Sequence, residues 1–275
     1  MKSGKQHFRY EELTWPEINQ RVAEDRVVIL PVAMLEDHGH HLPIATDVLI
    51  TSEICQRTAE AIPDDVILIP TQIHGYSPHH MDFPGSITIQ GPTLVEYMLD
   101  ITRSLIHHGF HRILLVNGHG SNTPWLETVA RLTIIEHPEC LCALINWWEI
   151  LELLEMVDTF RTSPPGGMSH AGELETSLML AIHPDMVDMR HAVKDISYQT
   201  SPHFPPRDLV QSGGPRLMEY WSTISRTGVM GDATVASVTK GTRWLAAAIK
   251  GLQCIITEFR TREIRDRKNH HGLKS

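Results

Sequence analysis

The sequence lacks a long apolar run, an excess of positive charge and a dense set of cysteines, and each absence excludes a class of protein. No apolar stretch approaches the roughly 18 residues that a membrane-spanning helix needs. The polar segment Met1–Glu12 also lacks the apolar core of a signal peptide. A net charge of −9 argues against nucleic acid or an anionic membrane as a partner. We therefore expect a soluble, cytoplasmic protein.

The few cysteines fall in apolar or helical stretches, without the spacing of a metal site or a disulfide framework. They are Cys55, Cys140, Cys142 and Cys254. We interpret them as reduced, buried thiols. The 275 residues can bury a large core, and they contain no repeat, low-complexity tract or convincing linker. The sequence therefore predicts a single domain over residues 1–275.

Apolar segments alternate with amphipathic ones along the chain. Strands are expected at 27–32, 66–70, 112–116 and 141–146. Helices are expected at 15–23, 48–61, 93–109, 123–137, 171–182 and from about 235 onward. Thr14 begins a capping box, Thr93 is expected to cap the third helix, and Gly109 to end it. This alternation predicts an α/β fold of three layers, with helices on both sides of a mostly parallel sheet.

Two segments have no periodic pattern. Residues 71–91 are rich in histidine, glycine and proline, and long loops of this kind are usually functional. Their His79, His80 and Asp82 either cover a site or belong to a solvated loop. Residues 197–216 are rich in proline and are interpreted as a surface arm or an oligomer contact.

Residues 36–47 gather carboxylates and imidazoles directly after the first predicted strand. Open α/β folds place their ligands at this carboxyl edge of the sheet. Oxygen and nitrogen donors together suit a divalent metal. Glu36 and His38 are two residues apart, so in extended backbone they point to the same face. The segment predicts the metal site of an enzyme; the plain alternative is an acidic loop that caps a helix.

Further ligands are offered by His119, after the third strand, and by the segment that begins at His170. Two divalent ions carry four positive charges, which Glu36, Asp47, a third carboxylate and a bridging hydroxide would balance. The balance matters because buried, uncompensated charge is costly. Glu173 and Glu175 are the candidates for the third carboxylate. A histidine such as His119 can also simply fill a turn.

Rival chemistries have weaker support. Residues 117–120, Asn-Gly-His-Gly, match no phosphate-binding glycine pattern, and no Gly-x-Ser-x-Gly elbow is present. A dinuclear phosphoesterase should carry Arg or Lys beside its metal loops, but residues 35–47, 117–122 and 164–175 contain neither. A non-catalytic, metal-stabilised scaffold remains an alternative.

Seven segments then match, in order, the motifs of one family: 31–39, 42–43, 46–47, 83–86, 117–122, 170–177 and 228–232, with Lys240-Gly241 after them. Together they resemble the creatininase (creatinine amidohydrolase) family. The resemblance implies a single α/β domain, usually in a homohexamer, with two divalent metal ions that are zinc, manganese or iron. It implies that Glu36 and His119 hold one ion, His38 holds the other, and Asp47 bridges both.

The sequence departs from creatininase itself at two places. Ser121 stands where creatininase has a glutamate that completes the second metal site. As in relatives that share this serine, the resemblance then implies Glu175 as the ligand, with Glu173 as the fallback. Gly166 stands where creatininase has a tryptophan that closes the pocket over creatinine, which weakens creatinine as the substrate.

Metal chemistry and the resemblance together predict the reaction. Two cations lower the pKa of a shared water toward 7, and the resulting hydroxide attacks a small-molecule amide or another C–N bond. His170 resembles the family's substrate-contacting histidine and is expected, with the ligand Glu175, to be catalytic. It would donate a proton to the leaving nitrogen, or else only anchor residues 164–169. Trp148 and Ser121 are candidate substrate contacts, although Trp148 also suits the core. Creatinine, a formamide and a peptide remain alternative substrates.

Overall fold

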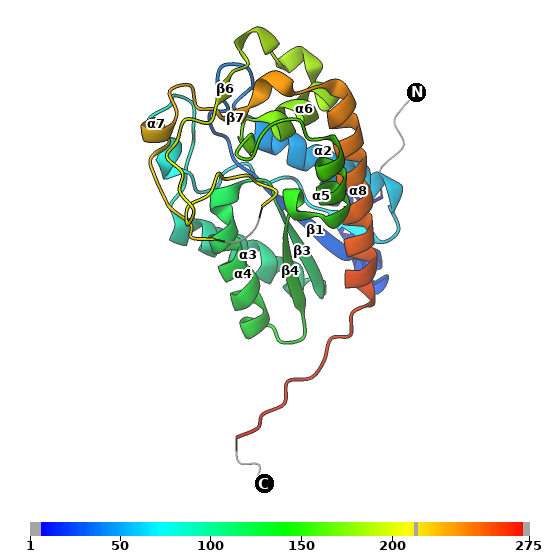
Figure 1. Cartoon of the computed structure of the whole chain (residues 1–275). Coiled ribbons are helices and arrows are strands. Elements are labelled where there is room, and N and C mark those ends of the chain that lie inside the picture. Colours follow the sequence, from blue (N-terminus) through cyan, green and yellow to red (C-terminus); the bar gives the residue numbers. More distant parts are fainter. Residues whose placement is uncertain (1–6, 212–213, 272–275) are drawn as a thin grey trace.

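The centre of the fold is a four-stranded parallel sheet in the order β2-β1-β3-β4 (Figure 1). The computed structural model describes residues 7–211 and 214–271. The strands are β1 (Val27–Val32), β2 (Val66–Leu68), β3 (Arg112–Asn117) and β4 (Leu141–Asn146). Val32 pairs with Asn117, and Asn117 with Asn146, so β1, β3 and β4 end at the same level. Residues that follow these strands therefore meet at one edge of the sheet.

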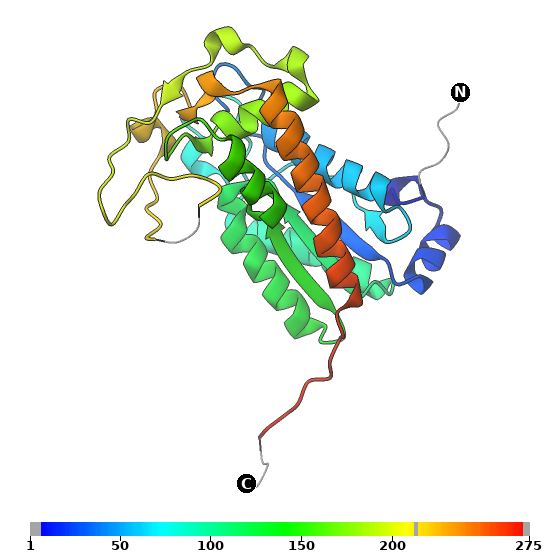
Figure 2. The same ribbon diagram turned by 45° about the vertical axis from the view of Figure 1, so that its right-hand side comes forward.

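Helices cover both faces of this sheet, as predicted (Figures 1 and 2). One face packs against α3 (Gly91–His107) and α4 (Thr123–Glu136). The other packs against α2 (Thr46–Ala61), α5 (Leu151–Phe160), α6 (Glu173–Ile182) and α8 (Val238–Thr261). Alternate residues of β1 contribute to the two cores, with Val28 and Leu30 on one side and Val27 and Ile29 on the other. Burial on both faces explains why this strand reads as a continuous apolar run.

A small antiparallel sheet lies beyond the carboxyl edge of the large one (Figure 1). Its order is β5-β7-β6, formed by β5 (Met168–His170), β6 (Lys194–Asp195) and β7 (Met230–Asp232). This sheet was not predicted from the sequence, because strands of two or three residues show no periodicity. The predicted loop 164–169 thus ends within a strand, which brings His170 to the edge of the parallel sheet.

The helix boundaries confirm some predictions and correct others. The capping box at Thr14 begins α1 (Trp15–Ala23), and Gly109 follows α3 in a left-handed conformation, φ +99°. Thr93 does not cap α3, which begins at Gly91 because Pro92 suits the first turn. The last helix begins at Val238, where the Ser237 side chain caps it, and not at 235.

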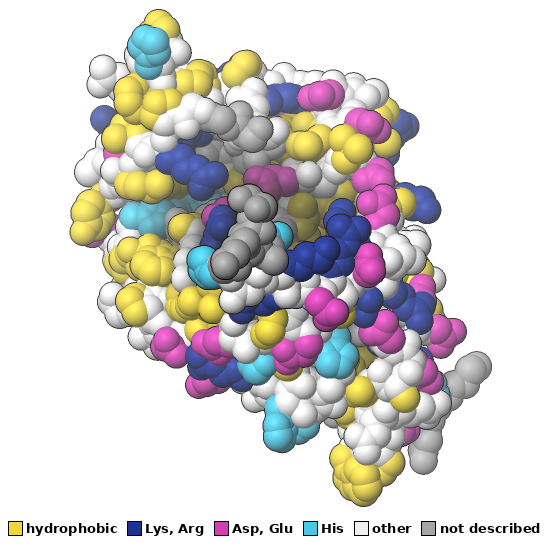
Figure 3. All heavy atoms as spheres, turned by 90° about the horizontal axis from the view of Figure 1, so that it is seen from below, with side chains coloured by type: hydrophobic (Ala, Val, Ile, Leu, Met, Phe, Trp, Pro, Cys, Tyr) yellow, Lys and Arg dark blue, Asp and Glu magenta, His cyan; other side chains and the backbone are white. Residues whose placement is uncertain are grey.

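The helices, the surface charges and the cysteines can be compared with what the composition predicted. Within residues 7–211 and 214–271, no helix has both the length and the apolar character to span a bilayer. Figure 3 shows one face on which Lys and Arg side chains lie among Asp and Glu. All four cysteines are free, but only Cys55 and Cys140 are buried; Cys142 and Cys254 are partly exposed, contrary to the prediction.

Candidate metal centre and active site

Six sequence-predicted side chains meet at the carboxyl edge of the parallel sheet, and all are buried. They are Glu36 and His38 after β1, Asp47 in the first turn of α2, His119 after β3, His170 at the end of β5, and Glu175 in the first turn of α6. Their ligand atoms fall into overlapping groups whose members lie within 4.8 Å of one another. The strand register and the two helix N-termini therefore build one cluster from distant parts of the chain.

The first ligand group consists of Glu36, Asp47 and His119. His119 Nδ1 lies 3.1 Å from Glu36 Oε1 and 3.2 Å from Asp47 Oδ2. The other ring nitrogen, Nε2, lies 3.2 Å from the carbonyl oxygen of Tyr76. A carbonyl only accepts, so Nε2–H donates to it, and Nδ1 is the ring nitrogen that faces the carboxylates and could bind a metal ion. Histidines that bind metals are typically oriented in this way.

The second ligand group consists of His38, Asp47 and Glu175. His38 Nε2 lies 3.1 Å from Asp47 Oδ1 and 4.0 Å from Glu175 Oε1. Its Nδ1 lies 3.2 Å from the carbonyl oxygen of Glu36, to which Nδ1–H donates, so Nε2 is the ring nitrogen that faces the carboxylates. Asp47 thus presents Oδ2 to the first group and Oδ1 to the second.

The donors of this cluster fit divalent ions. Buried polar atoms normally have hydrogen-bond partners. His38 Nε2 and Asp47 Oδ2 lie close to other atoms of the cluster, yet neither makes a hydrogen bond with a described residue. Burial alone would lower the pKa of His38, but Asp47, Glu175 and Glu36 outweigh it and raise that pKa to about 10. Burial, together with the charge of Asp47, raises the pKa of Glu175 to about 7. These shifts reflect carboxylates crowded in a dry site, which a bound cation would relieve.

Of the two candidate carboxylates on α6, only Glu175 faces the cluster. Glu173 is fully buried on the opposite side, where it pairs with Lys240 and accepts from the backbone N–H of Ser163 at 2.8 Å. Glu175 also accepts from the backbone N–H of Ala171 at 2.6 Å, which holds its carboxylate in place. The geometry therefore supports Glu175 as the third carboxylate and excludes Glu173.

His170 sits beside the cluster in a defined protonation state. Its Nε2 lies 2.8 Å from the backbone oxygen of Asp37, to which it must donate, and its Nδ1 lies 3.7 Å from Glu36 Oε1. Burial, reinforced by His38 and His80, lowers the pKa of His170 to about 3. The ring is therefore neutral, with an unprotonated Nδ1 toward the cluster. Before it can donate a proton to a leaving group, it has to accept one there.

Of the side chains around His170, His80 was predicted in a loop that either covers a site or is solvated, whereas Trp221 was not predicted. His80 Nδ1 lies 2.7 Å from Asp37 Oδ1, and the Trp221 ring stacks on His80 with centroids 4.4 Å apart. Trp221 also meets His170 edge-on, at 5.2 Å. The histidine-rich loop 71–91 was a signal for His80, which does reach the site. Trp221 lies about 140 residues further along the chain, and no local pattern marked it.

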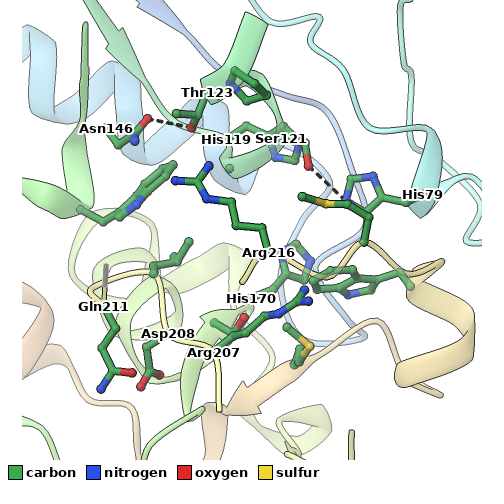
Figure 4. A pocket seen from close by; sticks show the side chains of 18 of the residues that line it. His79, His119, Ser121, Thr123, Asn146, His170, Arg207, Asp208, Gln211 and Arg216 are labelled. Atoms are coloured by element: carbon green, nitrogen blue, oxygen red, sulfur yellow. Dashed lines mark hydrogen bonds between the residues drawn. The ribbon is translucent and has the colours of Figure 1, made fainter. Parts of the chain in front are cut away.

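A pocket of about 830 Å³ opens over the cluster. Trp148 and Ser121 line it, and Ser121 Oγ lies 3.2 Å from His79 Nε2 (Figure 4). Much of the remaining wall comes from residues 197–216, which we call the arm. The arm was predicted as a surface arm or an oligomer contact. Of its described residues, 205–209, 211 and 214–216 line the pocket, and residues 212–213 lie outside the described part. Arg207 and Arg216 of the arm line the pocket, although residues 35–47, 117–122 and 164–175 contain no basic side chain, as the sequence shows.

The arm also explains the glycine at position 166. Gly166 has φ +88°, and a Cβ there would lie 2.6 Å from the Tyr198 hydroxyl and 3.1 Å from Pro206 Cβ. No side chain fits at this position while the arm is in place. The arm therefore fills the space into which a side chain at residue 166 would project.

Comparisons with known proteins identify the family. The sequence model described as "Creatininase: Creatinine amidohydrolase" matches residues 11–256. The creatinine amidohydrolase of Pseudomonas putida is 31% identical over 262 residues, which cover 90% of this chain and 95% of that protein. The mycofactocin precursor peptide peptidase of Mycolicibacterium smegmatis is 29% identical over 229 residues, which cover 82% of each chain.

Solved structures agree with this assignment. A crystal structure of creatinine amidohydrolase matches with a TM-score of 0.78 and 30% sequence identity, covering 95% of this chain and 100% of that one. A creatininase mutant described as "Zn-Zn type" and a structure described as "Creatininase Mn" each match with a TM-score of 0.77 and 30% identity, covering 93% of this chain and 99% of theirs. This chain therefore belongs to the creatininase family and is an amidohydrolase.

Proposed function

We propose that this enzyme hydrolyses an amide, or another non-peptide C–N bond, of a small molecule with two divalent metal ions bound at the cluster. The observation that carries the proposal is Asp47, whose two carboxylate oxygens face two separate groups of ligands. The donors of the cluster are carboxylate oxygens and imidazole nitrogens, which suit zinc, manganese and iron. The zinc and manganese creatininase structures support the first two metals.

Each proposed ion has its own ligands. Glu36 and His119 would hold one, His38 and Glu175 the other, and Asp47 would bridge them. Three carboxylates and neutral imidazoles leave a small positive excess around two divalent ions, which favours a negative group between them. Bound there, the ions would supply a water of lowered pKa and polarise a carbonyl oxygen.

The chain's own residues handle the proton and the substrate. His170 Nδ1 would accept a proton from the water and pass it to the leaving nitrogen, while the Asp37 carbonyl holds the ring through Nε2. His80 and Trp221 pack around His170 and restrict its motion. Trp148, largely buried on the pocket wall, would stack on a planar substrate, and Ser121 would contact it.

Creatinine itself has less support than the reaction class. The wall over the pocket is the arm packed on Gly166, and not an aromatic side chain at that position. A formamide or a peptide bond would use the same groups, and the peptidase relative supports the latter alternative. We further propose that the chain acts as one domain in a cytoplasmic homo-oligomer, a hexamer by likeness to the family.

Reconstitution tests the proposal. Chelator-treated protein should be inactive against a panel of formamides, cyclic ureas and creatinine, and zinc or manganese should restore turnover of at least one compound. Titration should reach full activity at about two ions per chain. Turnover that survives complete removal of metal would contradict the metal-dependent reaction.

The two glutamates of α6 provide a matched pair. Glu175→Gln is expected to lose the ion held with His38, because an amide binds a divalent cation more weakly than a carboxylate does. Glu173→Gln should keep both ions but lower the free energy of unfolding by about 3 kcal/mol, because Lys240 then lacks a charged partner. Metal analysis and thermal unfolding separate the two effects. Equal metal loss in both variants would contradict the assignment of Glu175.

A further inference from the structure

We infer that the substrate carries an anionic group, a carboxylate or a phosphate, that binds Arg216 while its scissile bond lies at the metal cluster. This inference rests on the proposed function and adds the class of substrate. Arg216 lines the pocket, and Figure 4 shows its side chain extending from the arm among the lining residues. A guanidinium placed there recognises planar oxyanions through paired hydrogen bonds.

The guanidinium of Arg216 has no carboxylate partner in the part of the chain that the structure describes. No carboxylate of residues 7–211 and 214–271 forms an ion pair with it, whereas Asp208 of the arm pairs with Arg161 at 2.9 Å. Glu149, another acidic lining residue, accepts from Asn146 Nδ2 at 2.9 Å. The remaining acidic lining residues belong to the cluster, where metal ions would balance them. The unmatched positive charge of the pocket wall is therefore on the arm.

Hydrogen bonds hold the middle of the arm against the backbone of residues 166–168. Asp208 is buried and accepts from the backbone N–H groups of Gly166 and Met168, at 3.0 and 2.7 Å. A guanidinium N–H of Arg207 donates to the carbonyl oxygen of Leu217, the residue after Arg216, so it connects the middle of the arm to its carboxyl end. The Arg207 backbone N–H also donates to the Tyr198 hydroxyl at 2.8 Å. These contacts hold Asp208, Arg207 and Leu217 beside the pocket; Arg216, which precedes Leu217, is exposed to solvent and lines the pocket.

Size and polarity favour a ligand longer than a compact amide. At about 830 Å³, the pocket is near the upper end of the range for small-molecule sites. Trp148, Leu209 and Met218 add apolar surface to its wall. A substrate with an apolar or aromatic body between its amide and its acid would contact the cluster, Trp148 and Arg216 together.

Inert ligands test this without requiring turnover. The probes are three hydroxamates that chelate the metal ions through the same head group: 4-carboxybenzohydroxamate, 4-phosphonobenzohydroxamate and the neutral 4-acetylbenzohydroxamate. Calorimetry on the zinc-loaded protein gives each Kd. We expect at least one anionic probe to bind about tenfold more tightly than the neutral one, as for a charge-assisted hydrogen bond. The tighter of the two anions identifies the carboxylate or the phosphate.

Variants test whether Arg216 is the cause of tighter binding of the anionic probes. Arg216→Gln should bring the anionic and neutral probes within about twofold, and Arg216→Lys should keep part of the preference. Arg265→Gln, in the exposed tail, should leave it unchanged. Equal binding of all probes, or a preference that survives Arg216→Gln, would overturn the inference and leave the metal site intact. Failure of every probe to bind would instead contradict the metal site, and the inference with it.

Discussion

Replacing Asp47 by asparagine is expected to remove both metal ions and to lower kcat/KM by at least about 10³-fold, equivalent to roughly 4 kcal/mol of transition-state stabilisation. The reason is geometric: one oxygen of Asp47 lies 3.2 Å from His119 Nδ1 and the other lies 3.1 Å from His38 Nε2. Asparagine keeps the shape but loses the charge and one acceptor oxygen. Metal analysis and steady-state kinetics on the same preparation measure the two losses.

A matched control is Asp185→Asn, which changes an exposed carboxyl outside the site. It should retain metal and turnover. If Asp47→Asn kept two ions per chain, Asp47 would not bridge them. If it lost the metal but kept its turnover, the ions would be structural and the proposed chemistry would be wrong.

His170→Ala should have the second-largest effect on turnover, with the metal retained. We expect kcat to fall by about 10²- to 10³-fold, because the proton acceptor at Nδ1 is gone while the proposed ligands remain. His40→Ala is the control, since His40 lies in the segment 36–47, beside the proposed ligands, but is exposed. Single-turnover kinetics and metal analysis distinguish the outcomes.

The metal content of His170→Ala is informative because His170 also lies within ligand distance of Glu36 and His38. Loss of an ion from this variant would make His170 a ligand and not a proton carrier. Unchanged turnover with intact metal would leave His170 only the role of anchoring the loop before β5.

The parallel sheet and its helices could be predicted because their signals are local and long. β1, β3 and β4 are six-residue strands, and their apolar runs placed them to within a residue. β5, β6 and β7 hold two or three residues each and form only through pairing between distant segments. Such pairing is set by tertiary contacts, and three residues carry too little pattern to reveal it.

The candidate site divides in the same way. Glu36, His38 and Asp47 were predictable because they lie in one motif beside a strand end. The choice between Glu175 and Glu173 required the structure, because only the helix orientation and Lys240 decide it. The contribution of the arm to the pocket was not predicted. Its arginines reach the pocket through contacts such as Asp208 with Gly166, which no spacing along the sequence indicates.

The most direct test of the account is the metal content per chain, measured by mass spectrometry on protein purified without a chelating tag. The bridging position of Asp47 between two ligand groups predicts about two zinc, manganese or iron ions per chain. One ion would contradict the bridged pair and the role of Glu175. None, even after incubation with zinc or manganese, would contradict the metal-dependent mechanism altogether.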